Sequence, residues 1–110
     1  MSVSLAEVQA TIRRQMDNGL DGDIQLTTFV AGLGEEAGEV LGVLNKTVYD
    51  PQKTKNFKQR VTEKSSEEAW CKELGDVLWY LTAVATCKGL SLDVIWEKNQ
   101  EKLTARHGFR

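Results

Sequence analysis

Residues 33–44, LGEEAGEVLGVL, place three glutamates in a stretch that is otherwise apolar or glycine. A second stretch, KELGDVLWYL at residues 72–81, repeats the pattern with Glu73 and Asp76 among leucine, valine and aromatic residues. In both stretches the apolar residues recur at helical spacing, three or four positions apart. Each stretch is therefore predicted to be an amphipathic helix that carries carboxylates beside its packing face.

The rest of the chain is also helical in pattern, and no stretch alternates with the period of two that is typical of a strand. Ser4 with Glu7 and Ser65 with Glu68 have the spacing of capping boxes, and Pro51 follows the end of the second helix. The expected helices cover residues 4–16, 25–48, 65–89 and 91–106. The predicted fold class is all-α: an antiparallel four-helix-bundle domain whose core is completed by dimerisation.

Composition limits the classes of protein to consider. The 110 residues fit a single domain, residues 1–110, and a core of this size favours self-association. A net charge of −2 does not favour binding to nucleic acid or to an acidic membrane surface. Cys71 and Cys87 form no CxxC pair, so a disulfide framework or zinc site is not expected. The N-terminus lacks a signal-peptide pattern and no apolar run is long enough to span a membrane, so a cytoplasmic location is expected.

The acids lie beside the packing faces of their helices. At 100° per residue, Glu36 and Glu39 border the apolar stripe of one helix, while Glu35 lies further around it. Glu73 and Asp76 form a similar strip on the other helix. If the two helices pack side by side, four carboxylates converge and repel one another unless a cation is present. Oxygen ligands alone favour Mg²⁺ or Mn²⁺ over zinc, whereas the alternative is an ordinary solvated helix surface.

These motifs resemble a known signature. EEAGE at 35–39 followed by ELGD at 73–76 is similar to the EExxE…ExxD pattern of the MazG-like all-α nucleoside triphosphate pyrophosphohydrolases. NQEKLTAR at 99–106 resembles the run that closes many such domains, and the resemblance covers about residues 25–107. It implies a four-helix-bundle core, Mg²⁺-dependent cleavage to monophosphate and pyrophosphate, and dimers or dimers of dimers.

The resemblance also implies roles for single residues. Glu36, Glu39, Glu73 and Asp76 take the metal-ligand positions. Glu35 takes the position of a group that orients the attacking water. All five acids are therefore expected to be catalytic.

Substrate contacts are expected beside the acids and on the last helix. Asn99, Lys102 and Arg106 share one face of the last helix and are assigned to phosphate or sugar, unless they are a solvated helix end. Tyr80 is expected to stack on the sugar or base, or else to pack in the core. The basic connection, residues 50–64, has no assigned role. The expected substrate contacts are Tyr80, Asn99, Lys102, Arg106 and Lys46.

The predicted function is Mg²⁺-dependent hydrolysis of nucleoside triphosphates, with Mn²⁺ as a substitute, for control or house-cleaning of the nucleotide pool. Deoxynucleotides, and among them purines such as dGTP, are the expected substrates. One alternative is a phosphoribosyl-ATP pyrophosphohydrolase, which has the same metal chemistry and another substrate. Another is a non-catalytic helical regulatory module whose acids bind a structural cation.

Three glycines line one edge of the second helix. Gly34, Gly38 and Gly42 are four residues apart, and each costs about 1 kcal/mol of helix propensity relative to alanine. This spacing favours close approach by another helix, with ligand contact as the alternative.

Overall fold

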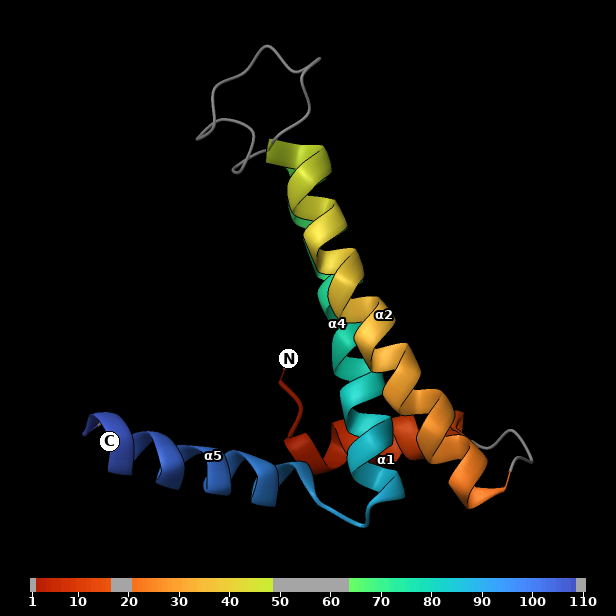
Figure 1. The fold of residues 1–110 in the computed structure, drawn as a ribbon, viewed down its shortest axis with the longest axis vertical. Coiled ribbons are helices and arrows are strands. Elements are labelled where there is room, and N and C mark those ends of the chain that lie inside the picture. Colours follow the sequence, from red (N-terminus) through yellow and green to blue (C-terminus); the bar gives the residue numbers. More distant parts are fainter. Residues whose placement is uncertain (1, 17–20, 49–63, 109–110) are drawn as a thin grey trace.

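The computed structural model describes residues 2–16, 21–48 and 64–108, and the side chains of 45–48 and 64–66 fall outside that description. Within these ranges the chain forms four helices and no strand (Figure 1). They are α1 (Leu5–Gln15), α2 (Gly22–Val48), α4 (Lys64–Cys87) and α5 (Leu92–His107). The all-α fold class is therefore confirmed.

Local capping explains where α1 and α5 begin. The Ser4 hydroxyl accepts from the backbone N–H of Glu7 at 3.1 Å, and the Ser4 N–H donates to the Glu7 carboxylate at 3.0 Å. This is the capping box expected at this position. At α5, the Ser91 hydroxyl accepts from the N–H of Val94 at 3.1 Å. Both helix starts lie where the sequence placed them.

Two other helix starts differ from expectation. The carboxylate of Asp21 accepts from the N–H of Asp23 at 2.9 Å, and its carbonyl accepts from the N–H of Gln25 at 2.8 Å. These bonds satisfy donors of the first turn, so α2 begins at Gly22 rather than at Gln25. Because α4 already includes Lys64, Ser65 lies inside the helix and is not its cap.

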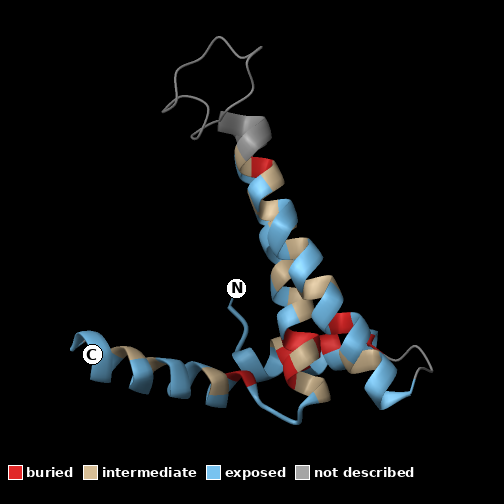
Figure 2. Ribbon diagram, viewed as in Figure 1, coloured by how far each residue is buried: buried red, intermediate tan, exposed pale blue. Residues whose placement is uncertain are grey.

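The helices α2 and α4 run antiparallel and side by side, and α1 crosses their lower ends (Figure 1). Buried residues gather at that crossing, whereas exposed and half-buried residues dominate further up the α2/α4 pair (Figure 2). The buried cluster contains Ile12 and Met16 from α1 and its end, Phe29 from α2 and Ala83 from α4. The main buried cluster of the described residues therefore lies at one end of the pair, whereas Val43 is buried near the other end of α2.

The chain turns sharply between α4 and α5. Gly89 adopts a left-handed conformation with φ of 68°, and the N–H of Leu90 donates to the carbonyl of Ala85 at 2.9 Å. This pattern is a Schellman cap, which ends a helix and redirects the chain. As a result, α5 leaves the turn at 100° to α4 and packs against α1.

The four helices do not close into a bundle within the described part of one chain. The radius of gyration is 17.2 Å, whereas a compact domain of this length has about 13 Å. No single helix in the described ranges is long and apolar enough to cross a membrane; the pair Glu67–Cys87 and Leu92–His107 satisfies length and composition together but is bent by 100°.

Gln9 joins three helices through one buried side chain. Its amide nitrogen donates to the hydroxyl of Thr86 at 3.1 Å and to the carbonyl of Leu90 at 2.9 Å. Its amide oxygen accepts from the N–H of Leu92 at 3.0 Å. Gln9 is 8% exposed, so water does not replace these bonds readily.

Replacing Gln9 by alanine is expected to lower the free energy of unfolding by about 2–4 kcal/mol, because buried donors and acceptors lose their partners. Urea unfolding followed by circular dichroism at a fixed protein concentration measures this. Thr11→Ala, which removes an exposed hydroxyl that accepts from Arg14, is the control and is expected to change it by less than about 0.5 kcal/mol. Equal effects of the two substitutions would contradict this role of Gln9.

Candidate functional site

Three carboxylates from two helices converge near the middle of the α2/α4 pair. Glu36 comes from α2, and Glu73 and Asp76 lie three residues apart on one side of α4. One carboxylate oxygen from each lies within 4.8 Å of those of the other two. Glu36 and Glu73 are half-buried and Asp76 is exposed, so the group opens to solvent on one side.

The group is electrostatically unfavourable without a cation. Loss of hydration raises the pKa of Glu36, and the charges of Asp76, Glu73, Glu39 and Glu35, in decreasing order, raise it further. No lysine or arginine in the described ranges forms an ion pair with these carboxylates. Within the described part of the chain, no cationic side chain therefore relieves this repulsion.

The donor set fits a hard divalent cation. All three groups offer carboxylate oxygens, which Mg²⁺ and Mn²⁺ prefer, and neither cysteine nor histidine belongs to the group. Octahedral Mg²⁺ with ligands at about 2.0–2.1 Å places adjacent oxygens about 2.9 Å apart and opposite oxygens about 4.2 Å apart. Small changes of side-chain rotamer bring oxygens that lie within 4.8 Å of one another into this range.

The two other predicted acids lie beside this group rather than in it. Glu39 is exposed, and its Oε2 lies 3.9 Å from the position that a Cβ atom on Gly42 would occupy. Its carboxylate therefore extends along α2 towards the next turn. Glu35 is exposed and lies further around α2, as the helical wheel predicted.

Tyr80 belongs to the contact between the two helices. Its half-buried ring lies edge-on to Trp79 at 5.1 Å and tilted against Phe29 at 6.3 Å between centroids. A Cβ atom on Gly32 would lie 2.6 Å from its Cδ1 atom, so α2 approaches the ring closely at this glycine. The ring thus occupies the core position that the sequence left as an alternative to stacking on substrate.

Gly32 was not among the glycines predicted to make a close contact, although its position one turn before Glu36 could have indicated it. Gly34 and Gly38, which were predicted to make one, face open space, and no side chain of the described part of the chain lies within 4 Å of a Cβ atom placed on either. Gly32 lies one turn before Glu36, and it faces the aromatic residue one turn after Asp76. The close approach of α2 to Tyr80 therefore follows from the position of Gly32 one turn before Glu36, and not from a regular spacing among glycines.

The substrate contacts predicted on α5 are not brought to the acids of the same chain. Asn99, Lys102 and Arg106 are exposed on α5, which packs on α1 and diverges from the α2/α4 pair (Figure 1). Lys46 lies in the last turn of α2, and its side chain is outside the described residues, as is the basic connection up to residue 63.

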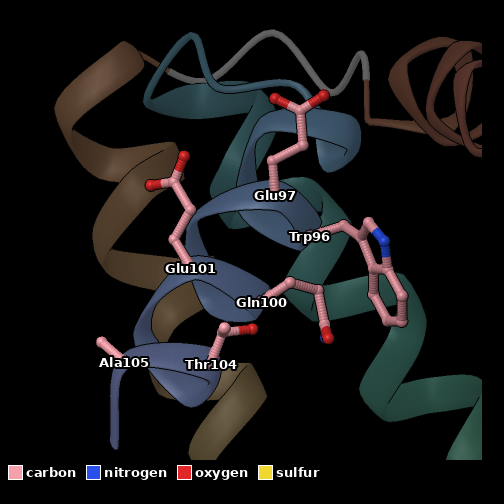
Figure 3. Close-up of a pocket in the computed structure, with 6 residues that line it drawn as sticks. All are labelled: Trp96, Glu97, Gln100, Glu101, Thr104 and Ala105. Atoms are coloured by element: carbon pink, nitrogen blue, oxygen red, sulfur yellow. The ribbon is translucent and has the colours of Figure 1, made fainter. Parts of the chain in front are cut away.

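A hollow on α5 is unsuited to a triphosphate. It has a volume of about 610 Å³, and all of its lining residues project from this one helix (Figure 3). Its charged groups are the carboxylates of Glu97 and Glu101, and it includes no cation. The lining residues are Trp96, Glu97, Gln100, Glu101, Thr104 and Ala105.

Comparison with known proteins agrees with the signature carried by α2, α4 and α5. The family model of the MazG nucleotide pyrophosphohydrolase domain matches residues 25–109, which include all three acids of the converging group. No curated protein and no solved structure matches the chain. Since the family model covers most of the 110 residues, the chain belongs to the MazG nucleotide pyrophosphohydrolase family.

Proposed function

We propose that the chain hydrolyses nucleoside triphosphates to the monophosphate and pyrophosphate with Mg²⁺, or with Mn²⁺ in its place. The observation that carries this proposal is the convergence of Glu36, Glu73 and Asp76 in a chain of the MazG family. No cation of the described residues pairs with these carboxylates, so a divalent cation would relieve their repulsion, and a cation with open coordination positions also binds phosphate oxygens.

The acids have two different proposed roles: some would bind the cation, and one would orient the attacking water. Glu36, Glu73 and Asp76 would hold the cation, and Glu39, three residues after Glu36, would join them after a change of rotamer. When bound, the cation neutralises charge on the triphosphate and on the departing pyrophosphate. Glu35 would orient water and accept its proton as the oxygen attacks phosphorus and the α–β anhydride bond breaks.

We further propose that deoxynucleoside triphosphates, including the purine dGTP, are the substrates and that the role is control or house-cleaning of the cytoplasmic nucleotide pool. A panel of the eight common NTPs and dNTPs, with dUTP, oxidised nucleotides and phosphoribosyl-ATP, tests this choice when scored for pyrophosphate and monophosphate. Preferential turnover of phosphoribosyl-ATP would replace the proposed substrate class but leave the metal chemistry intact.

Asp76→Asn is expected to reduce kcat by at least about 100-fold, because it removes a metal-binding charge without changing the shape of the side chain. Helical circular dichroism is expected to remain unchanged. Glu68→Gln, which alters an exposed acid of α4 outside the converging group, is the matched control and should retain full activity. Normal turnover by the Asp76 variant would refute the assigned site, and Mg²⁺ binding without any wild-type turnover would favour the regulatory module.

The raised pKa of Glu36 predicts how stability depends on pH. The folded chain binds this proton more tightly than the unfolded chain, so without metal the stability that it contributes is lost as pH rises from the ordinary value of 4.5 through the raised pKa. Mg²⁺ binds the deprotonated group, so its stabilising effect should grow with pH. Thermal unfolding from about pH 4 to pH 7, with and without Mg²⁺, measures both trends. Glu36→Gln should reduce the pH dependence of stability both with and without Mg²⁺. Identical pH profiles of variant and wild type would contradict the assignment of this dependence to Glu36.

Exposed apolar residues support the proposal that the chain is a homo-oligomer, a dimer or dimer of dimers. On α4, Leu74, Leu78 and Leu81 form a stripe and are 52%, 47% and 38% exposed. On α2, Val30 and Leu41 are 50% and 59% exposed. At 100° per residue, each set lies on average about 130–140° around its helix from the converging acids, so neither set is centred on the acidic strip. A second copy that packs against these apolar residues would complete a four-helix core.

We also propose that α5 contacts the nucleotide phosphates of a second copy. Asn99, Lys102 and Arg106 remain exposed and separated from the acids of their own chain. Trp96 on the same helix is 61% exposed, which leaves an apolar anchor available to another subunit. The cations Lys102 and Arg106 near the end of α5 have the opposite charge to the converging carboxylates of the α2/α4 pair, which favours this contact.

Mixing two inactive variants tests the assembly and the shared site together. Glu73→Gln and the double substitution Lys102→Ala/Arg106→Ala are each expected to lose at least about 30-fold in kcat/KM. After joint refolding, hybrid dimers would hold one intact site, and about a quarter of wild-type activity should return. Refolding Glu73→Gln with Arg14→Ala, an exposed cation of α1, is the control for handling. A dimer or tetramer by light scattering with no recovered activity would refute a shared site, and a monomer at micromolar concentration would refute the assembly.

A further inference from the structure

We infer that Gly32 and Tyr80 form a spacer that sets the separation of the metal-binding carboxylates, with Gly32 as the positioning residue. The inference rests on the proposed metal site. It concerns the distance between α2 and α4 at the level of that site, which neither residue touches directly.

The contact between these two residues has no spare room. A Cβ atom on Gly32 would lie 2.6 Å from Cδ1 and 2.8 Å from Cζ of Tyr80, and closer still to Cε1. Carbon atoms in normal contact are about 3.5–4.0 Å apart, so an alanine here requires the ring or the helix to move by about 1 Å or more. No other glycine of the described ranges has an atom of a neighbouring helix within 4 Å of such a Cβ position.

The ring of Tyr80 is held on its other sides. Trp79 lies edge-on to it, with centroids 5.1 Å apart, and Phe29 is tilted against it at 6.3 Å. Phe29 and Trp79 also pack edge-on to each other at 5.6 Å, and Phe29 is buried. The indole N–H of Trp79 donates to the side chain of Gln15 at 2.7 Å, which fixes this group against α1. The ring is therefore a stiff spacer rather than the free end of a flexible chain.

The helical register places this spacer next to the carboxylates. Glu36 follows Gly32 by four residues on α2, and Asp76 precedes Tyr80 by four residues on α4. Because the helices run antiparallel, both steps lead in the same direction along the pair, from the Gly32–Tyr80 layer to the Glu36–Asp76 layer. A change in helix separation at one layer therefore reaches the next layer, one turn away.

Divalent cations differ in their tolerance of such a change. Mg²⁺ requires near-octahedral ligands at about 2.0–2.1 Å, and Mn²⁺ also favours octahedral oxygen sites, whereas Ca²⁺ accepts six to eight oxygens at about 2.3–2.6 Å in flexible geometry. A wider separation of the carboxylates should therefore lower the affinity for Mg²⁺ and Mn²⁺ more than the affinity for Ca²⁺. Partial unfolding, in contrast, would lower the affinity for all three ions to the same extent.

The test uses the whole chain without nucleotide. Mn²⁺ binding is measured by electron paramagnetic resonance, with Mg²⁺ and Ca²⁺ as competitors. For Gly32→Ala we expect the Kd for Mn²⁺ and Mg²⁺ to rise at least tenfold and that for Ca²⁺ to rise less than threefold. Gly38→Ala is the matched control, since its Cβ would enter open space, and it should leave all three affinities unchanged.

A second substitution distinguishes spacing from general damage. Gly32→Ala combined with Tyr80→Leu removes the ring atoms that the new methyl group meets, and it should recover Mn²⁺ affinity to within threefold of wild type. Mn²⁺ affinity of Gly32→Ala within twofold of wild type, or equal losses for Mn²⁺ and Ca²⁺, would overturn the inference. If the wild type bound no Mn²⁺, the metal site of the proposed function would fall with it, whereas normal wild-type binding beside an unaffected Gly32 variant would overturn only the spacer.

Discussion

The contact between α2 and α4 is the constraint on which the rest of the structure depends. It holds the carboxylates of Glu36, Glu73 and Asp76 close together against their mutual repulsion. Its aromatic part, Phe29 with Trp79 and Tyr80, lies just below the carboxylates. Each edge-to-face or tilted pair contributes about 0.5–1.5 kcal/mol beyond its buried area. Loss of hydration and then the repulsion among the carboxylates raise the pKa of Glu36, and this packing opposes the repulsion. A site that is assembled before the cation arrives loses less entropy when the cation binds.

Local sequence was sufficient to predict the four helices of the described ranges and the starts of two of them. Capping at Ser4 and Ser91 depends on residues three positions apart, so those helix starts needed no tertiary information. The neighbourhood of Glu36, Glu73 and Asp76 followed from helical periodicity and one assumption, that the two helices pack side by side. The Asp21 cap was missed because an aspartate in a glycine-rich segment favours both a loop and a helix start.

Tertiary features were not predictable in the same way. The direction of α5 depends on the turn at Gly89 and on the bonds that Gln9 makes to residues about 80 positions away in sequence, which no periodic pattern encodes. The close approach at Gly32 depends on which side of α2 meets an aromatic ring. Regular glycine spacing was a weaker guide, because Gly34 and Gly38 face open space in the single chain. A glycine that meets a neighbouring helix and a glycine that faces open space can be told apart only from their contacts in three dimensions.

The α2/α4 pair carries an exposed apolar stripe as well as carboxylates, which supports the proposed assembly. Leu74, Leu78 and Leu81 lie on average about 140° around α4 from Glu73 and Asp76. Beyond the crossing with α1, no other helix of the described ranges covers the pair, so apolar side chains stay exposed along it. Packing of a second copy against this stripe would press α2 and α4 together. Assembly and metal geometry would then be coupled through one distance, the separation of the two helices, which the Gly32–Tyr80 contact sets from within.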